Sequence, residues 1–435
     1  MALKFENGVI TAPAAIGQQT YSLADTGFGT VAAILLFATY ETAEADTNGH
    51  GIFCQGLGSY RGAVAQQWCN YIFDVDAAGS SDTARGASAT AIMRGFSAST
   101  PTVDFSAALV SLGTAQFVLD WTDVPASLIK VHYVALGGSD VTDAMVGTFD
   151  GGTGTPPYNE DVTVVAGFGK PDLLFGIGAL RAAALGDSAG HWNLFFGVGN
   201  GTDQGFTAMF AEDGRPSMEV AARQETGIFA YQWAEDTVAS MNASLAAKAD
   251  WPTDGFRLVH QVNAQDAALS GFLALRGTFT AVIGSGLAPI TGTLPVIQDL
   301  AVGQTPRGAI FFHNSLAAFT GELIASADLG TYGIGVLDGT HEGWEGVGQD
   351  DAAATSIAHR HHSESKAVKM FTPGDAGTLQ SEADGSFSGN NVRLSWNDID
   401  TVAREYRYLL LGDGVAAGSL ILPNRARSVA GQLGR

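Results

Sequence analysis

Apolar and polar residues alternate along a short stretch that occurs three times in the chain. Its first copy is Phe117-Val-Leu-Asp-Trp121, and a second stretch, Tyr133-Val-Ala-Leu-Gly137, follows it. The same pair recurs at 256–260 with 272–276 and at 392–396 with 408–412. The first residues of the two stretches are 16 positions apart in every copy. A constant spacing within a changing composition indicates three copies of one structural unit.

Within each copy the apolar residues occupy every second position. Phe117, Leu119 and Trp121 alternate with polar or smaller residues, which predicts a strand with one face over a core. The connection to the second stretch is rich in turn-forming residues, so the simplest interpretation is a central hairpin. We predict burial of Trp121, His260 and Trp396, with a polar partner for the His260 ring. The predicted core comprises Phe117, Leu119, Trp121, Tyr133, Phe256, Leu258, Phe272, Leu394, Trp396 and Tyr408.

A second landmark precedes the alternating stretch in each copy. Glycines 27, 167 and 303 lead into apolar runs, of which 31–37 (Val-Ala-Ala-Ile-Leu-Leu-Phe) is the clearest. These glycines lie 90, 89 and 89 residues before the alternating stretch. The length of the run and the turn residues around it predict a strand that is buried on both faces.

The two landmarks predict the fold class and the domain boundaries. Many short strands separated by Gly, Asp, Asn and Ser clusters are typical of an antiparallel sandwich or jelly roll. We therefore expect an all-β chain of three tandem jelly-roll-like β-sandwich domains, each of about 135 to 140 residues, at 1–140, 141–277 and 278–414. The remaining segment, 415–435, is apolar and then basic. It is expected either to contact a neighbouring subunit in an assembly or to be a frayed terminus.

Composition and charge exclude several classes of function. The net charge of −22 argues against binding to nucleic acid, because Lys and Arg contacts supply most of that affinity. No stretch approaches the roughly 18 to 20 apolar residues of a membrane span, and the start does not have the pattern of a signal peptide. We expect a soluble chain made in the cytoplasm and not inserted in a membrane. Cys54 and Cys69 are either buried thiols or one bond.

The densest set of potential metal ligands is His359-Arg-His361-His362-Ser-Glu364. On a strand, His359 and His361 would point to one face, where copies related by symmetry could complete a metal site. The other interpretation is a solvated strand or loop with a charge that depends on pH. We keep His359 and His361 as weak metal candidates, since no second cluster of ligands is apparent elsewhere in the sequence.

An aromatic residue between two carboxylates suggests a carbohydrate contact. Trp344 lies between Glu342 and Glu345, where an exposed ring would stack on a sugar and the acids would bind its hydroxyl groups. These three residues are weak candidates for glycan binding. The two acids are also the residue types of a glycosidase pair, although their separation does not follow from sequence.

Two further matches have weak support. Gly186-Asp-Ser188-Ala-Gly190 fits the G-x-S-x-G pattern, but a nucleophile elbow needs a strand, a sharp turn and a helix. Asp74, Asp76 and Asp82 offer oxygen ligands for calcium without the spacing of an EF-hand. None of these sets stands at equivalent positions in all three units. We therefore predict a protein that is not an enzyme, with no catalytic residues and no cofactor.

The landmarks resemble a tandem-repeat virion structural protein of tailed bacteriophages. Its motifs are Gly-Phe-x-Pro-Lys/Arg-Ala-Val/Ile-Leu-Phe, Asp-Gly-Phe-x-Leu-x-Trp and Tyr-Leu-Ala-Leu-Gly. Residues 303–311 match the first with Gln304 in place of Phe, and 254–258 begin the second, in which His260 replaces Trp. Residues 117–121 and 133–138 match the second and third almost throughout. Arg276, where the motif has Gly, suggests a different packing or binding role for that unit.

The resemblance implies a protein of the virion surface, either a head decoration or a tail appendage. It also implies symmetric assembly into a homo-oligomer, with copies of itself and other virion proteins as partners. The alternative is a tail-fibre or baseplate module that binds a host-surface glycan or receptor, and a polysaccharide depolymerase is less favoured. Three units in one chain are compatible with a pseudo-threefold disc and with an extended rod.

Overall fold

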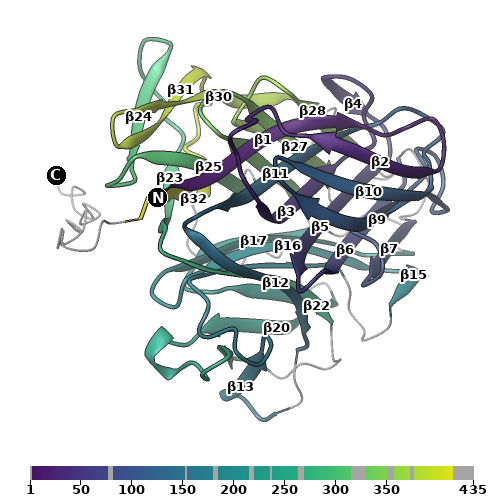
Figure 1. The fold of residues 1–435 in the computed structure, drawn as a ribbon. Coiled ribbons are helices and arrows are strands. Elements are labelled where there is room, and N and C mark those ends of the chain that lie inside the picture. Colours follow the sequence, from purple (N-terminus) through teal and green to yellow (C-terminus); the bar gives the residue numbers. More distant parts are fainter. Residues whose placement is uncertain are drawn as a thin grey trace.

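The computed structural model describes residues 2–76, 82–151, 154–179, 185–214, 220–235, 238–262, 269–314, 330–349, 357–372 and 377–414. Almost all regular structure in these residues is antiparallel β-strand, with one short 3-10 helix, η1 (Lys248–Asp250). The strands form six sheets, a large and a small one in each of three sandwiches (Figure 1). The predicted all-β fold of tandem antiparallel sandwiches is confirmed. Strands β1–β11, β12–β22 and β23–β32 are called the first, second and third units below.

The first unit packs a large sheet against a small one. The large sheet has the order β1-β11-β3-β5-β6-β7-β15 and the small sheet has the order β2-β10-β9-β8. Its strands are β1 (Leu3–Thr11), β2 (Gly17–Ser22), β3 (Val31–Ala38), β4 (Ala45–Asn48), β5 (Gly51–Arg61), β6 (Val64–Asp74), β7 (Thr83–Ser88), β8 (Met93–Phe96), β9 (Val103–Gly113), β10 (Gln116–Asp123) and β11 (Lys130–Gly138).

The second unit repeats this arrangement with the orders β12-β22-β14-β16-β17-β18 and β13-β21-β20-β19. Its strands are β12 (Val141–Phe149), β13 (Tyr158–Thr163), β14 (Leu173–Gly178), β15 (Gly186–Ala189), β16 (Trp192–Gly199), β17 (Gln204–Ala211), β18 (Val220–Thr226), β19 (Ala230–Glu235), β20 (Val238–Leu245), β21 (Gly255–His260) and β22 (Ser270–Gly277).

The third unit has the orders β23-β32-β25-β26-β27-β28-β4 and β24-β31-β30-β29. Its strands are β23 (Thr280–Leu287), β24 (Val296–Ala301), β25 (Pro306–His313), β26 (Gly330–Leu337), β27 (Glu342–Gln349), β28 (Ala358–Ser363), β29 (Val368–Phe371), β30 (Leu379–Ser388), β31 (Asn391–Asp398) and β32 (Glu405–Gly412). Residues 415–435, with their predicted assembly contact, lie outside the described residues.

The central strands of each large sheet are buried on both faces, which explains the continuous apolar runs in the sequence. Along β3, Ile34 and Leu36 pack in the core of the first sandwich, which also contains the free thiols Cys54 and Cys69. Leu35 and Phe37 on the opposite face pack in a second core that draws residues from all three units. Burial of the 31–37 run on both faces, predicted from its length and the turn residues around it, is therefore found, and the other two units contribute to the second cover.

The three large sheets meet around this shared core. Rings of different units are in contact there: Phe196 lies 6.1 Å from Phe37 and 5.3 Å from Phe312, between ring centroids. The amide of Gln55, in the first unit, hydrogen-bonds both other units. Its Nε2 donates to the carbonyl oxygen of Phe195 at 2.9 Å, and its Oε1 accepts from the Tyr332 hydroxyl at 2.9 Å. The units are thus grouped around one centre and do not form an extended rod.

Two short strands each pair with the large sheet of a different unit. In the first unit, β4 follows β3 in the chain but pairs with β28 of the third unit. In the second unit, β15 follows β14 in the same way and pairs with β7 of the first unit. The corresponding segment of the third unit, 315–329, is outside the described residues. At both described junctions, a strand from one unit extends the large sheet of another.

The repeated pair of stretches is not a hairpin, so that prediction is wrong. Phe117–Trp121 lies in β10, in the small sheet, whereas Tyr133–Gly137 lies in β11, in the large sheet. Both strands already have two neighbours, since β10 pairs with β2 and β9 and β11 pairs with β1 and β3. The turn-rich connection therefore crosses from one sheet to the other, and the two strands face each other across the core.

The predicted core positions are buried, with one exception. Trp121, His260 and Trp396 are each 0% exposed. Tyr408 is only partly buried. Its counterpart Tyr133 packs against Phe117 and donates its hydroxyl to Glu6 at 2.7 Å. At the positions equivalent to Phe117 and Glu6, the third unit has the smaller Val392 and the apolar Val282. Tyr408 is therefore covered less completely.

Candidate functional site at the junction of the first and third units

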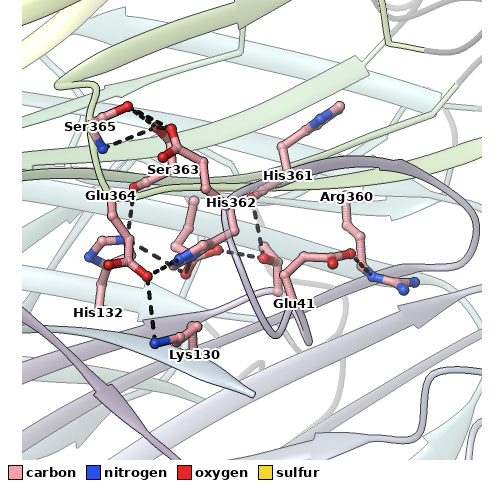
Figure 2. Close-up of polar contacts among 12 residues, drawn as sticks. Glu41, Lys130, His132, Arg360, His361, His362, Ser363, Glu364 and Ser365 are labelled. Carbon is pink, nitrogen blue, oxygen red and sulfur yellow. Dashed lines mark hydrogen bonds and ion pairs between the residues drawn. The ribbon is translucent and has the colours of Figure 1, made fainter. Parts of the chain in front are cut away.

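Strand β28 places four polar residues, 359–362, at the junction where the third unit meets the first. It pairs on one edge with β27 of its own unit and on the other with β4 of the first unit. Because side chains alternate along a strand, His359 and His361 share one face, and Arg360 and His362 share the other. The face with His362 is turned toward the first unit, from which His132 approaches on β11 (Figure 2).

Three buried side chains from three strands converge on this face. They are His132 on β11, Glu345 on β27 and His362 on β28, each 1% exposed or less. His362 Nδ1 lies 2.8 Å from Glu345 Oε1, and His132 Nε2 lies 3.9 Å from the same oxygen. One potential ligand atom from each residue lies within 4.8 Å of the other two. Within the described ranges, no other trio of His, Cys, Asp or Glu comes this close.

A surrounding set of polar groups orients the three side chains. Thr39 donates its hydroxyl to Glu345 Oε2 at 2.5 Å, and Glu364 Oε1 lies 3.4 Å from His362 Nε2. The Nε2 atom of His132 contacts the carbonyl oxygen of Ser363 at 3.0 Å. The Nδ1 atom of His132 is buried and has no hydrogen-bond partner among the described atoms. Three of the ring nitrogens are thus positioned by oxygen atoms.

The pKa values of the two imidazoles are shifted in opposite directions. Burial alone would lower the pKa of His362, but the charge and hydrogen bond of Glu345, with Glu364, raise it to about 9. Burial, together with the charge of His362, lowers the pKa of His132 to about 3. Burial also raises the pKa of Glu345, and the charge and hydrogen bond of His362 oppose that rise. At neutral pH, His362 is therefore protonated beside Glu345, and His132 is neutral.

Further ion pairs and hydrogen bonds around the trio connect β28 to the loop before β4. Arg360 Nε pairs with Glu41 Oε1 at 2.6 Å, and both side chains are about one tenth exposed. Ser363 and Ser365 both donate to Glu44 Oε1, at 2.7 and 2.6 Å (Figure 2). These contacts hold the segment that leads from β3 to β4 against the third unit.

The predicted metal candidates lie together on the opposite face of β28. His359 Nδ1 is 2.5 Å from His361 Nε2, and the other nitrogen of His361 is 3.0 Å from Asp46 Oδ1. Asp46 itself pairs with Lys369 Nζ at 2.8 Å. Burial lowers the pKa of both imidazoles. On this face the Lys369 ammonium group already neutralises the Asp46 carboxylate. The compact trio of potential ligands is on the other face and contains neither His359 nor His361.

The glycan patch predicted at Glu342, Trp344 and Glu345 is wrong, because β27 is an interior strand. Trp344 is 2% exposed, and its Nε1 lies 3.3 Å from His313 Nε2. Glu342 accepts from the Gly385 amide at 2.5 Å, and burial raises its pKa to about 7. Glu342 and Glu345 are an odd number of positions apart on one strand, so they point to opposite faces of the sheet and cannot flank one glycosidic bond.

The two weaker matches also have structural explanations. The G-x-S-x-G stretch includes β15, which pairs with β7 of the first unit, and the hydroxyl of Ser188 donates to the carbonyl oxygen of Ala189. No nucleophile elbow is formed by these residues. Asp74 is fully buried and burial raises its pKa well above the usual range, whereas Asp82 is exposed. Residues 79–81, between them, lie outside the described residues.

Sequence reasoning missed His132 and the role of Glu345. The trio joins residues more than two hundred positions apart, so no local spacing signals it. One departure from the repeat was available: His132 stands where the other units have Gly271 and Arg407. A histidine in a core strand, at a position where the other copies have different residues, is the sequence signal that could have pointed to a site specific to the first unit.

Comparisons of the chain with protein-family models, with curated proteins and with solved structures found no match. Among the described residues, no helix has the length and apolar character needed to cross a membrane.

Proposed function

We propose that this chain is a structural protein of a tailed-phage virion, exposed on the particle as a head decoration or a tail appendage. The observation that carries the proposal is the shared central core, in which all three sandwiches bury their large sheets. A chain whose repeats share a core and exchange strands is suited to mechanical rigidity. The repeated landmarks resemble those of phage virion proteins, but they are core and turn residues, so they support the fold more than the role.

An exposed apolar surface on the third unit supports association with other copies. Four large apolar side chains in or beside β23 and β24 are each 45 to 49% exposed, and a fifth, in the loop before β32, is 44% exposed. They are Leu287, Ile290, Leu294, Ile297 and Val402. The Ala288 amide donates to the Arg404 carbonyl at 2.8 Å, which brings the two segments together. Apolar residues that cluster on a surface mark a contact with another protein.

Mass spectrometry and immunogold labelling of purified particles from a phage that encodes this chain test the role. We expect the chain in the particles, with labels on their outer surface. Absence from purified particles would overturn the proposal. Light scattering on the isolated protein tests self-association: we expect a multiple of 45.0 kDa that Leu294→Asp reduces. Leu185→Asp is the matched control, because Leu185 is 51% exposed outside this surface.

A second candidate, recognition of a host-surface glycan, is favoured by a basic hollow in the second unit. Lys170, Lys248 and Arg276 line a cavity of about 440 Å³ together with Asp172. Lys248 pairs with Asp172 at 2.5 Å, and Arg276 also interacts with the charge of Asp254, so three cations are close to two carboxylates in a chain of strongly negative net charge. Arg276 is the residue that departs from the glycine of the motif. The cavity suits an anionic group, such as a carboxylate or phosphate on a polysaccharide.

Binding of polygalacturonate, with neutral dextran as the comparison, tests this candidate. We expect binding of the anionic polymer that weakens with salt and is reduced at least about fivefold by Arg276→Gly, which restores the motif residue. Arg257→Gly is the control, because Arg257 is an exposed cation of the same unit, paired with Asp161. Equal loss in both variants, or equal binding of the two polymers, would contradict a specific site.

A further inference from the structure

The trio of His132, Glu345 and His362 has the composition and the size of a metal site. Two imidazoles and one carboxylate are a ligand set that zinc accepts. Two ligands about 2.1 Å from a tetrahedral ion lie roughly 3.4 Å apart. The distances from Glu345 Oε1 to the two ring nitrogens, 2.8 and 3.9 Å, lie on either side of that value. The third separation, between the ligand nitrogens of the two imidazoles, is up to 4.8 Å, so the two rings must approach each other by as much as about 1.4 Å to hold a tetrahedral ion.

The neighbouring groups match those that usually support metal ligands. A histidine bound to a metal donates its second ring nitrogen to a carboxylate or carbonyl oxygen. Glu364 is placed to accept that bond from His362 Nε2, and Thr39 donates to the second oxygen of Glu345. His132 is the exception: to bind through Nε2 it must give up the contact of that atom with the Ser363 carbonyl oxygen at 3.0 Å, and its buried Nδ1 has no hydrogen-bond partner among the described atoms.

The charge of the site also favours a divalent cation. Two carboxylates, Glu345 and Glu364, lie next to the two ligand imidazoles. Imidazoles bind metals in their neutral form, so a divalent ion would have a charge equal and opposite to that of the two carboxylates. Lys130, 3.8 Å from Glu364, is partly exposed and offsets charge mainly at the rim. Neutralisation matters here because unpaired charge is costly in a buried site.

We propose that His132, Glu345 and His362 bind one divalent transition-metal ion of the zinc class, which fastens the third unit to the first. His132 comes from the first unit, and Glu345 and His362 come from the third. The ion therefore adds a cross-link between two units that are also joined by packing, by the β4–β28 pairing and by ion pairs such as Arg360 with Glu41. Such a cross-link would stabilise the chain itself, wherever the protein is located on a particle.

Refolding of the full chain with cobalt(II) or zinc(II), followed by removal of loose metal, tests the site. Because the trio is buried, we expect the ion to enter during folding and to remain at one equivalent per chain. Cobalt should give the visible absorption of a four- or five-coordinate nitrogen and oxygen site, and zinc should remove that absorption. Metal should also raise the melting temperature in a concentration-dependent way.

Variants distinguish a metal site from a trio held only by hydrogen bonds and an ion pair. His132→Gln and His362→Gln should each lose the equivalent of metal and its spectrum. Glu364→Gln keeps all three ligands and should weaken binding about 10- to 100-fold. His341→Gln is the control, since His341 is half exposed and outside the trio. The proposal is overturned if the wild-type chain retains no metal, or if the two ligand variants retain as much as the wild type.

Discussion

The rings of Phe117 and Tyr133 meet edge to face across the first sandwich, with centroids 5.3 Å apart. Phe117 is on the small sheet and Tyr133 is on the large one. The same contact occurs in the second unit, between Phe256 and Phe272 at 5.1 Å. The constant spacing of 16 residues is therefore the length of chain that leaves one sheet, turns and re-enters the other opposite its starting point.

Truncation of Trp121 should destabilise the chain strongly. Trp121 is fully buried beside this contact, and its Nε1 donates to the Tyr21 hydroxyl at 3.0 Å. Trp121→Ala should lower the free energy of unfolding by about 3 to 5 kcal/mol, measured by urea denaturation. Val118→Ala, on the outer face of the same strand, should cost less than about 1 kcal/mol. A loss below 1 kcal/mol for Trp121→Ala would contradict its place in the core.

Gln55 should couple the three units energetically. Replacement by Leu keeps the volume but leaves the Phe195 carbonyl and the Tyr332 hydroxyl buried without this partner. Gln55→Leu should therefore cost about 1 to 3 kcal/mol of unfolding free energy. A double-mutant cycle with Tyr332→Phe isolates the contact between the first and third units, and we expect a coupling of at least about 0.5 kcal/mol. Additive losses would show that the two side chains act independently.

The ion pairs at the β4–β28 and β15–β7 junctions should contribute differently to the free energy of unfolding. Asp46 on β4 pairs with Lys369, which is 7% exposed, whereas Asp187 on β15 pairs with Arg94, which is 30% exposed. Asp46→Asn leaves a buried ammonium without its counterion and should cost roughly 1 to 3 kcal/mol. Asp187→Asn breaks a partly exposed pair and should cost about 1 kcal/mol or less. Thermal unfolding of the two variants gives the ranking, and the reverse order would refute this explanation.

The buried pair of His362 and Glu345 should make stability depend on alkaline pH in metal-free protein. The folded pKa of His362, about 9, is above its unfolded value of about 6.5. The stabilisation is thus complete below pH 6.5 and is lost as pH rises through 9. The groups that face His362 are Glu345, Glu364, His132, Glu44 and, at the rim, Lys130.

Urea denaturation from pH 6 to pH 10 measures this effect. The wild type should lose up to about 3 kcal/mol more than His362→Gln over that range. The exposed His341→Gln variant should follow the wild type. An NMR titration that places the His362 pKa below 7 would rule out the pair as the cause.

Local pattern determined much of the fold before any contact was known. Alternation in 117–121 identified a strand with one buried face, and the apolar run 31–37 identified a strand with two, because side-chain direction along a strand follows from the backbone alone. The same alternation predicts that His260 is a buried ring that needs a partner, and Glu160 Oε2 lies 2.7 Å from its Nε2.

Tertiary structure decided which strands are neighbours and which polar groups meet. The stretch at 117–121 has no feature that selects a sheet, so the crossing to the opposite sheet could not be distinguished from a hairpin. Trp344 appeared exposed because its neighbours in sequence are acidic, while its neighbours in space are strands on both sides. His132, Glu345 and His362 come together only because sheets buried on both faces must cover one another, and that packing brings distant parts of the chain into one site.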